Sequence, residues 1–186
     1  MATKNNRRTI VTKKLLKTAL MELMQEKQFT HITIKELCER ADLNRTTFYL
    51  HYTNLEVLLS EIEEEVAHKT LEYIHNIQGS NVEVTQITIF LKYIKENSSL
   101  FRTLLCNNPN GAFRDTFLNN LMESTRENMT TYKTPSQTYY VQNFIMAGSL
   151  NIITKWIEDD FEMPVDSLAN IIFKMTSSVV SGIKSA

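Results

Sequence analysis

Residues 33–52 read TIKELCERADLNRTTFYLHY, and the pattern of this stretch predicts two short helices joined by a turn. It begins with Thr33 and, three residues later, Glu36, which is the spacing of a capping box. In that motif the threonine hydroxyl accepts a hydrogen bond from a backbone N–H, and the glutamate accepts one from the threonine backbone. Apolar residues at helical spacing follow, so a short helix is expected from Ile34 to Ala41.

A turn and a second short helix come next. Asp42 tolerates turn conformations, and Asn44 is a good N-cap for a helix over 45–52. Two short helices joined by such a turn are typical of a helix-turn-helix, whose second helix enters the major groove of DNA with its first residues at the bases. Arginine can pair with guanine through two hydrogen bonds, and threonine can bond to base or phosphate. The second helix begins with residues of these two types: Arg45, Thr46 and Thr47.

Further helices are expected on both sides of this motif. Apolar residues from Val11 to Met24 recur at helical spacing and predict an amphipathic helix over 9–27. A break at Thr53 and Asn54 precedes a long helix over 55–78, which ends near Gly79. The later segments expected to be helical are 83–97, 98–107, 111–130, 135–158 and 164–180.

The composition favours the same fold class. The 186 residues include only four Gly and three Pro, whereas strand-and-turn folds need these residues at their corners. We therefore expect an all-α protein with an N-terminal three-helix helix-turn-helix head, joined by a long helix to a helical body. The expected domains are residues 1–55 and 56–186.

Charge is divided unevenly along the chain. Residues 1–52 hold ten Lys and Arg against five Asp and Glu, a net charge of +5 in a protein whose total is −1. The rest of the chain therefore carries −6. A basic head on an acidic body suggests a polyanion-binding module attached to a part with another task, although lysine-rich N-terminal segments also serve solubility.

The head resembles the DNA-binding domain of TetR-type (tetracycline-repressor-like) transcriptional regulators over residues 9–62. The likeness rests on a first helix that ends in FTHITI (29–34), on IKELCERA (34–41), on TTFYLHY (46–52) and on NLEVL (54–58). The resemblance implies that seven residues touch DNA: Thr33, Lys35, Arg45, Thr46, Thr47, Tyr49 and His51. It implies that Phe48 and Tyr52 pack the small core instead.

Two positions depart from the family pattern. Asp42 stands where the family usually has glycine, which is tolerable because Asp can adopt the left-handed conformation. Leu55 stands where the family commonly has a lysine that contacts phosphate, so weaker DNA binding with a flatter salt dependence is expected. Arg7 and Arg8 either compensate by reaching the DNA backbone or minor groove, or belong to a disordered, solvated arm.

The last two expected helices are apolar on more than one face, so they must be buried against something. The resemblance implies that they pair with their copies in a homodimer. The alternative is that they form the centre of a monomer's core. Aromatic residues cluster in the body and can line a cavity for a small apolar or amphipathic ligand, or form plain core instead: Phe90, Tyr93, Phe101, Phe113, Phe117, Tyr140 and Phe144. The resemblance implies a ligand-binding body but does not identify the ligand.

No catalytic, metal or cofactor motif emerges from the sequence. Two Glu-x-x-His pairs begin at Glu65 and Glu72, but on one helix they stand about 10 Å apart and cannot bridge one metal centre. Cys38 and Cys106 form neither a metal spacing nor a disulfide framework, and no apolar run is long enough to span a membrane. A cytoplasmic protein that is not an enzyme is expected.

We therefore expect a dimeric regulator that binds a near-palindromic operator on double-stranded DNA. The resemblance favours a repressor released by its ligand, although activators occur among such proteins. Two other functions stay open: a helix-turn-helix-like adaptor that binds proteins and has lost DNA binding, favoured by Leu55, and a helical metal-binding enzyme built on the Glu and His face.

Overall fold

All regular structure is helical in the residues that the computed structural model describes, which are 4–77, 84–107, 112–125 and 134–184. This confirms the predicted all-α fold. The elements in these ranges are α1 (Lys4–Glu26), the short 3-10 helix η1 (Phe29–His31), α2 (Ile34–Arg40), α3 (Arg45–Tyr49), α4 (Leu55–Ile77), α5 (Val84–Glu96), α6 (Ser98–Leu105), α7 (Ala112–Thr125), α8 (Pro135–Glu158) and α9 (Val165–Lys184).

The predicted capping residues form the hydrogen bonds that begin the helices of the head. Thr33 Oγ1 accepts from the Glu36 N–H at 3.3 Å, and the Glu36 carboxylate accepts from the Thr33 N–H at 2.9 Å. Asn44 Oδ1 accepts from the Thr47 N–H at 2.7 Å. Asp42, between the two helices, has a φ of 53°, the left-handed conformation for which the family uses glycine.

Two helix boundaries in the head differ from the prediction. Helix α1 begins at Lys4, so Arg7 and Arg8 lie in its first turns and are exposed there. Helix α3 ends at Tyr49 because the N–H groups of both His51 and Tyr52 turn back to the carbonyl of Phe48, at 2.9 and 3.0 Å. The predicted helix end near Gly79 and most of the two predicted loops at 107–111 and 128–136 lie outside the described residues.

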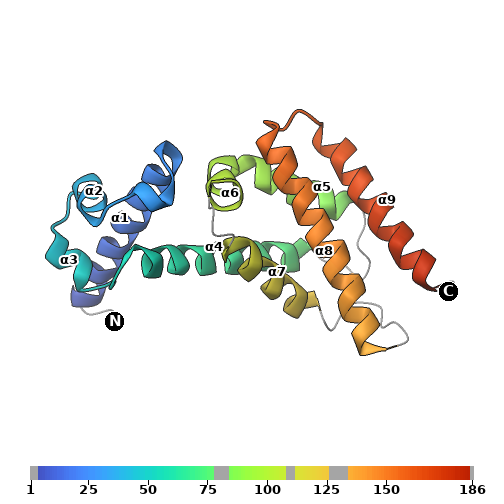
Figure 1. Cartoon of the computed structure of the whole chain (residues 1–186), viewed down its shortest axis with the longest axis horizontal. Coiled ribbons are helices and arrows are strands. Elements are labelled where there is room, and N and C mark those ends of the chain that lie inside the picture. The colour runs from blue at the N-terminus through green and yellow to red at the C-terminus, as the bar shows by residue number, and fades with distance from the viewer. Residues whose placement is uncertain (1–3, 78–83, 108–111, 126–133, 185–186) are drawn as a thin grey trace.

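The helices form an elongated molecule with the head at one end (Figure 1). Helices α1, α2 and α3 occupy that end, and α4 runs from them into the body. Within the body, α4 packs against α7 and α5 packs against α9. Helices α8 and α9 form the far side of the body, away from the head (Figure 1).

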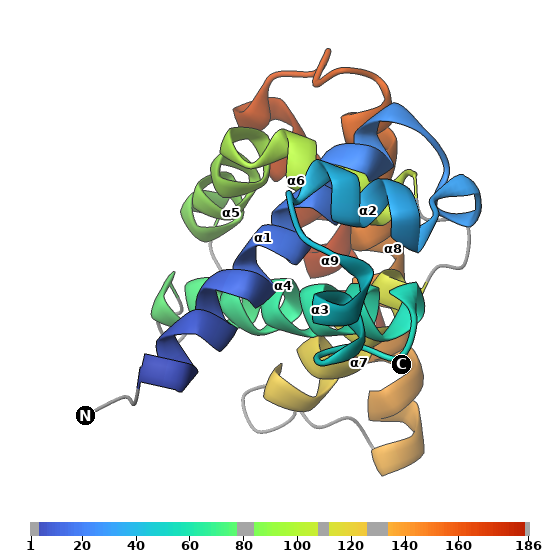
Figure 2. The same ribbon diagram turned by 90° about the vertical axis from the view of Figure 1, so that its left-hand side faces the viewer.

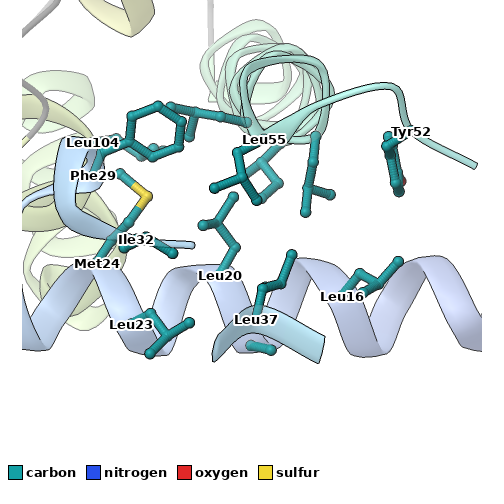
Figure 3. Close-up of a cluster of buried hydrophobic side chains, with 14 of the residues drawn as sticks. Leu16, Leu20, Leu23, Met24, Phe29, Ile32, Leu37, Tyr52, Leu55 and Leu104 are labelled. Atoms are coloured by element: carbon teal, nitrogen blue, oxygen red, sulfur yellow. The ribbon is translucent and has the colours of Figure 1, made fainter. Parts of the chain in front are cut away.

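One buried cluster continues from the head into the body. It is built on Leu16 and Leu20 of α1 and extends to Leu104 of α6 and Phe113 of α7. Figure 3 shows Leu104 beside Phe29, so the seam between head and body is filled by apolar side chains. A second cluster around the buried Trp156 joins α5, α6, α8 and α9. The domain boundary at residue 55 stays a prediction, since the first cluster crosses it.

Candidate nucleic-acid interface

Helix α3 lies at the outer end of the head, where one of its faces is free. Figure 2 looks onto this end and shows α3 nearest the viewer, in front of α4. Phe48 is fully buried and Tyr52 is 2% exposed, so these two residues hold the inner side of α3 and the turn after it. Arg45, Thr46 and Tyr49 are exposed on the other side. A duplex approaching this end would therefore meet the first turn of α3.

The remaining predicted contact residues surround that face. Thr33 and Lys35 are exposed at the start of α2, which packs against α3. Thr47 is half-buried, and its hydroxyl donates to Asn44 Oδ1 at 2.8 Å, so only its lone pairs remain for a ligand. His51 is half-buried against the ring of Tyr52. The structure thus places all seven predicted residues on two neighbouring helices and the turn after α3; their contact with DNA stays a prediction.

Ion pairs neutralise many of the cations in the head. Lys13 and Lys17 of α1 both bond to Glu61 of α4, at 2.9 and 2.7 Å. Lys27 bonds to Glu36 at 2.6 Å. Ion pairs also join Arg40 to Glu22 and Glu26 at 3.5 and 2.9 Å, and Lys35 to Glu39 at 3.8 Å. The net charge of +5 counted for residues 1–52 therefore overstates the positive charge available to a ligand. Glu61 lies outside that stretch and was not counted, yet it neutralises cations within it.

The cations left without an ion pair gather at the end of the molecule that carries α3. Among the head side chains that the structure describes, these are Arg7, Arg8, Lys14 and Arg45. Arg7 and Arg8 lie in the first turns of α1, and Lys14 lies near the middle of that helix. The start of α1 projects to one side at the same end of the molecule as α3 (Figure 2). Sequence reasoning missed Lys14, although it stands seven residues after Arg7 and therefore on the same side of the helix. Unpaired cations in the same head as the exposed helix α3 favour a ligand with a phosphate backbone, such as DNA.

The ion pairs shift the pKa of the groups that form them. The hydrogen bond from Lys27, together with those from Thr33, lowers the pKa of Glu36 to about 2. Burial lowers the pKa of Lys17, but hydrogen bonds to Glu61 and Glu65 outweigh that effect and raise it. Burial raises the pKa of Tyr52, and the nearby Glu61 adds to the shift. These groups therefore keep their ordinary charge at neutral pH, and the bonds of Lys17 to Glu61 and Glu65 hold α1 against α4.

The departure at residue 55 has a structural explanation. Leu55 is 8% exposed and belongs to the buried cluster of the head, together with Leu16 and Leu20 (Figure 3). It is a packing residue in this chain. The exposed position nearest to it in the first turn of α4 is Glu56, which cannot replace a cation.

The predicted pocket residues divide between the two buried clusters and the exposed surface. Phe113 and Phe117 stack at 5.8 Å in the first buried cluster. Tyr93 and Phe101 make an edge-to-face pair at 5.8 Å in the second. Phe90 is half-buried and touches both clusters. The other two predicted residues belong to neither buried cluster, and in a single chain their side chains face solvent: Tyr140 is 69% exposed and Phe144 is 67% exposed.

Two clefts in the described part of the chain lie elsewhere. One, of about 320 Å³, lies between α1 and α4 and includes Met21 and Ile62. The other, of about 400 Å³, lies between α6 and the turn that joins α8 to α9. It is lined mainly by polar side chains, among them Arg102 and Asp160, which form an ion pair at 2.6 Å. The predicted ligand pocket stays a prediction.

Within the described ranges, neither a cluster of metal ligands nor a membrane-spanning helix is found. No group of three or more His, Cys, Asp or Glu side chains there is placed to hold a metal ion. His68, in the first Glu-x-x-His pair, has its Nδ1 3.6 Å from Glu72, and both side chains are exposed. None of the helices described combines the length and the apolar character that a membrane span requires.

Comparisons with known proteins agree with this geometry. Residues 84–178, just over half of the chain, match the TetR-type family model described as the transcriptional regulator C-terminal region. The chain is 27% identical over 100 residues to the dhaKLM operon transcriptional activator DhaS of Lactococcus lactis, covering 54% of this chain and 52% of that protein. It is 21% identical over 170 residues to YxbF of Bacillus subtilis, an uncharacterized HTH-type transcriptional regulator, covering 87% of this chain and 44% of that one. These matches span about half the length of the curated relatives.

Solved structures share the fold over almost the whole chain. A TetR transcriptional regulator from Streptococcus agalactiae has a TM-score of 0.68 at 24% identity, covering 95% of this chain and 99% of the other. The fatty acid degradation regulator FadR from Bacillus halodurans has a TM-score of 0.65 at 15% identity, covering 92% and 96%. At these identities the likeness concerns the fold alone.

Proposed function

Since this chain belongs to the TetR-type family of transcriptional regulators, we propose that it binds operator DNA as a homodimer and that a small molecule changes its affinity for that DNA. The observation that carries the proposal is the coincidence of two features at one end of the molecule. The exposed face of α3 and the unpaired cations Arg7, Arg8, Lys14 and Arg45 all belong to the head, which forms that end (Figure 1).

Each contact group has its own task in the proposed complex. Helix α3 enters the major groove, where Arg45 forms two hydrogen bonds to guanine and Thr46 bonds to a base or phosphate. The hydroxyl of Tyr49 donates to phosphate. The cations at the start of α1 neutralise neighbouring phosphates, which takes over the task of the family's lysine at the position of Leu55. This removes the main reason to regard the head as an adaptor without DNA binding.

The outer faces of α8 and α9 support the homodimer. Phe144 of α8 and Met175 of α9 are 67% and 55% exposed, which a single chain does not explain. Gly148 and Gly182 lie on the same two helices, and a Cβ added at either would meet nothing within 4 Å in one chain. Small residues let helices approach closely, so a second copy of α8 and α9 can pack there and bury the aromatic side chains.

The seam between head and body supports control by a ligand. Helix α6 contacts α1 on one side and α8 on the other. Leu104 of α6 is 1% exposed and packs beside Phe29 of the head (Figure 3). A ligand that binds the body better in one position of α6 must shift the head as well, and DNA must then shift ligand affinity by the same factor. An apolar or amphipathic molecule suits the aromatic residues of the body.

We propose repression, relieved by the ligand, as the regulatory effect. Activation is the second candidate, because one relative carries the name of an operon activator. Both effects need the same DNA interface. They differ in where the operator lies relative to the promoter.

The test is fluorescence anisotropy of the full chain on DNA from upstream of its own gene, against a scrambled duplex, over a series of salt concentrations. We expect a clear preference for the native fragment and a steep fall of affinity with salt. Weak binding without preference would leave an operator elsewhere, which selection from random duplexes would recover. If that selection also enriches no sequence, the head does not read DNA and the proposal is wrong.

A further inference from the structure

The most exposed apolar side chain of the head belongs to Leu50, the residue directly after α3. Leu50 is 75% exposed, the highest value among the large apolar side chains that the structure describes. It caps the C-terminus of α3 with helical backbone angles, φ −69° and ψ −20°, and its N–H bonds to the Thr46 carbonyl at 3.2 Å. Leu50 therefore continues the helical path, one turn after Thr46.

Leu50 shares a face with the residues assigned to DNA. Helical neighbours four residues apart lie on one side, so Leu50 follows Thr46 as Tyr49 follows Arg45. The opposite side is held in the core by Phe48, which is fully buried. A duplex that contacts Arg45, Thr46 and Tyr49 must then cover the Leu50 side chain as well. That side chain has no polar atom with which to bond to a phosphate or a base.

We propose that Leu50 is a specificity-determining residue that recognises thymine through its C5 methyl group, an inference that rests on the proposed DNA binding. Thymine is the base whose major-groove edge carries a methyl group, whereas the other base edges there are dominated by hydrogen-bond donors and acceptors. An apolar side chain placed against any of those polar edges would remove water from it without replacing the hydrogen bond. Leu50 thus selects a T·A pair next to the bases read by Arg45 and Thr46.

The test removes one methyl group at a time from the operator. Each thymine of the selected site is replaced by deoxyuridine, which lacks the C5 methyl and keeps every hydrogen-bonding group. Wild-type protein should lose about fourfold in affinity per half-site at one position, the loss expected when one buried methyl is removed. Leu50→Ala should bind the thymine operator more weakly and lose nothing further on deoxyuridine. Leu50→Met, which keeps an apolar tip, should retain part of the methyl-dependent loss.

Two controls separate recognition from folding. Leu50 is exposed, so Leu50→Ala should leave the thermal unfolding midpoint unchanged. Ile89→Ala removes an exposed apolar side chain from α5 in the body, and it should respond to deoxyuridine like wild type.

The failure of this inference differs from a failure of the proposed function. If wild type binds a selected operator but Leu50→Ala shows the same deoxyuridine losses, or if Leu50→Ala binds as tightly as wild type, Leu50 does not recognise thymine. If wild type prefers no duplex at all, the proposed DNA binding is wrong and this inference falls with it.

Discussion

At the residue scale, we expect neighbouring side chains of α3 to have different tasks in the proposed DNA complex. Arg45 carries a guanidinium with no ion pair, and its geometry matches the two acceptors of guanine. Tyr49 is 58% exposed and offers one hydroxyl, suited to a phosphate that every sequence presents. The first residue should therefore determine which sequence is bound, and the second how tightly any sequence is bound.

Arg45→Ala and Tyr49→Phe form a matched pair that tests this division. Arg45→Ala should reduce the discrimination between operator and scrambled duplex by about 1–3 kcal/mol, since a bidentate contact to a base is lost. Tyr49→Phe should weaken both duplexes alike, by about 0.5–1.5 kcal/mol for one hydrogen bond. Anisotropy titrations on both duplexes measure the two effects. Equal losses on both duplexes for Arg45→Ala would contradict the role assigned to it.

Glu36 makes the free energy of unfolding of the head depend on pH in the acid range. Its pKa is about 2 in the folded chain, below the ordinary value of 4.5, because Lys27 and Thr33 bond to the carboxylate. The stabilisation is therefore complete above pH 4.5 and is lost as the pH falls toward 2. Urea unfolding at several pH values should show a smaller acid loss for Glu36→Gln, whose amide still caps α2 but does not titrate. An identical acid loss in both proteins would show that other groups cause it.

At the scale of elements, α6 connects the two buried clusters. It contributes Leu104 to the cluster shared with the head and Phe101 to the cluster of the outer body. Helix α4 makes a second connection between head and body, because it runs into the body and its Glu61 forms ion pairs with two lysines of α1. These contacts make the head and the inner body one packed unit.

Leu104→Ala should weaken this connection. The side chain is 1% exposed, so its removal leaves a cavity and should lower the free energy of unfolding by about 2–5 kcal/mol. Leu104→Met keeps the volume and should cost less than about 1.5 kcal/mol. Thermal unfolding followed by circular dichroism measures both. Comparable small losses for the two variants would mean that the seam carries little of the packing energy.

At the scale of the whole molecule, the exposed apolar residues of α8 and α9 allow the proposed homodimer to be tested by substitution. Phe144→Asp places a charge in the proposed interface, where it would be buried without a partner. Sedimentation over a range of concentrations should show wild type near twice 21.6 kDa and Phe144→Asp near 21.6 kDa, both with unchanged helix content. Asn119→Asp, on an exposed position of α7, is the matched control and should remain dimeric. A wild-type monomer at all concentrations would contradict the proposed homodimer.

The local features of the fold could be predicted because they depend on bonds between residues close in sequence. The capping box at Thr33 and the N-cap at Asn44 involve groups three residues away, and they form as expected. Errors occurred at boundaries without such a signal. Helix α1 begins before its apolar pattern does, and α3 ends early because two N–H groups share the carbonyl of Phe48.

The helix-turn-helix and the all-α architecture could be read from the sequence alone, because periodicity and capping act within one or two helical turns. Which head cations are free was decided only by the tertiary structure, since Lys17 meets Glu61 across 44 positions of the chain. Likewise, Leu50 and Leu55 are the same residue type five positions apart, yet one is 75% exposed and the other 8%. Burial depends on what packs against a side chain from distant elements, and no local pattern records that.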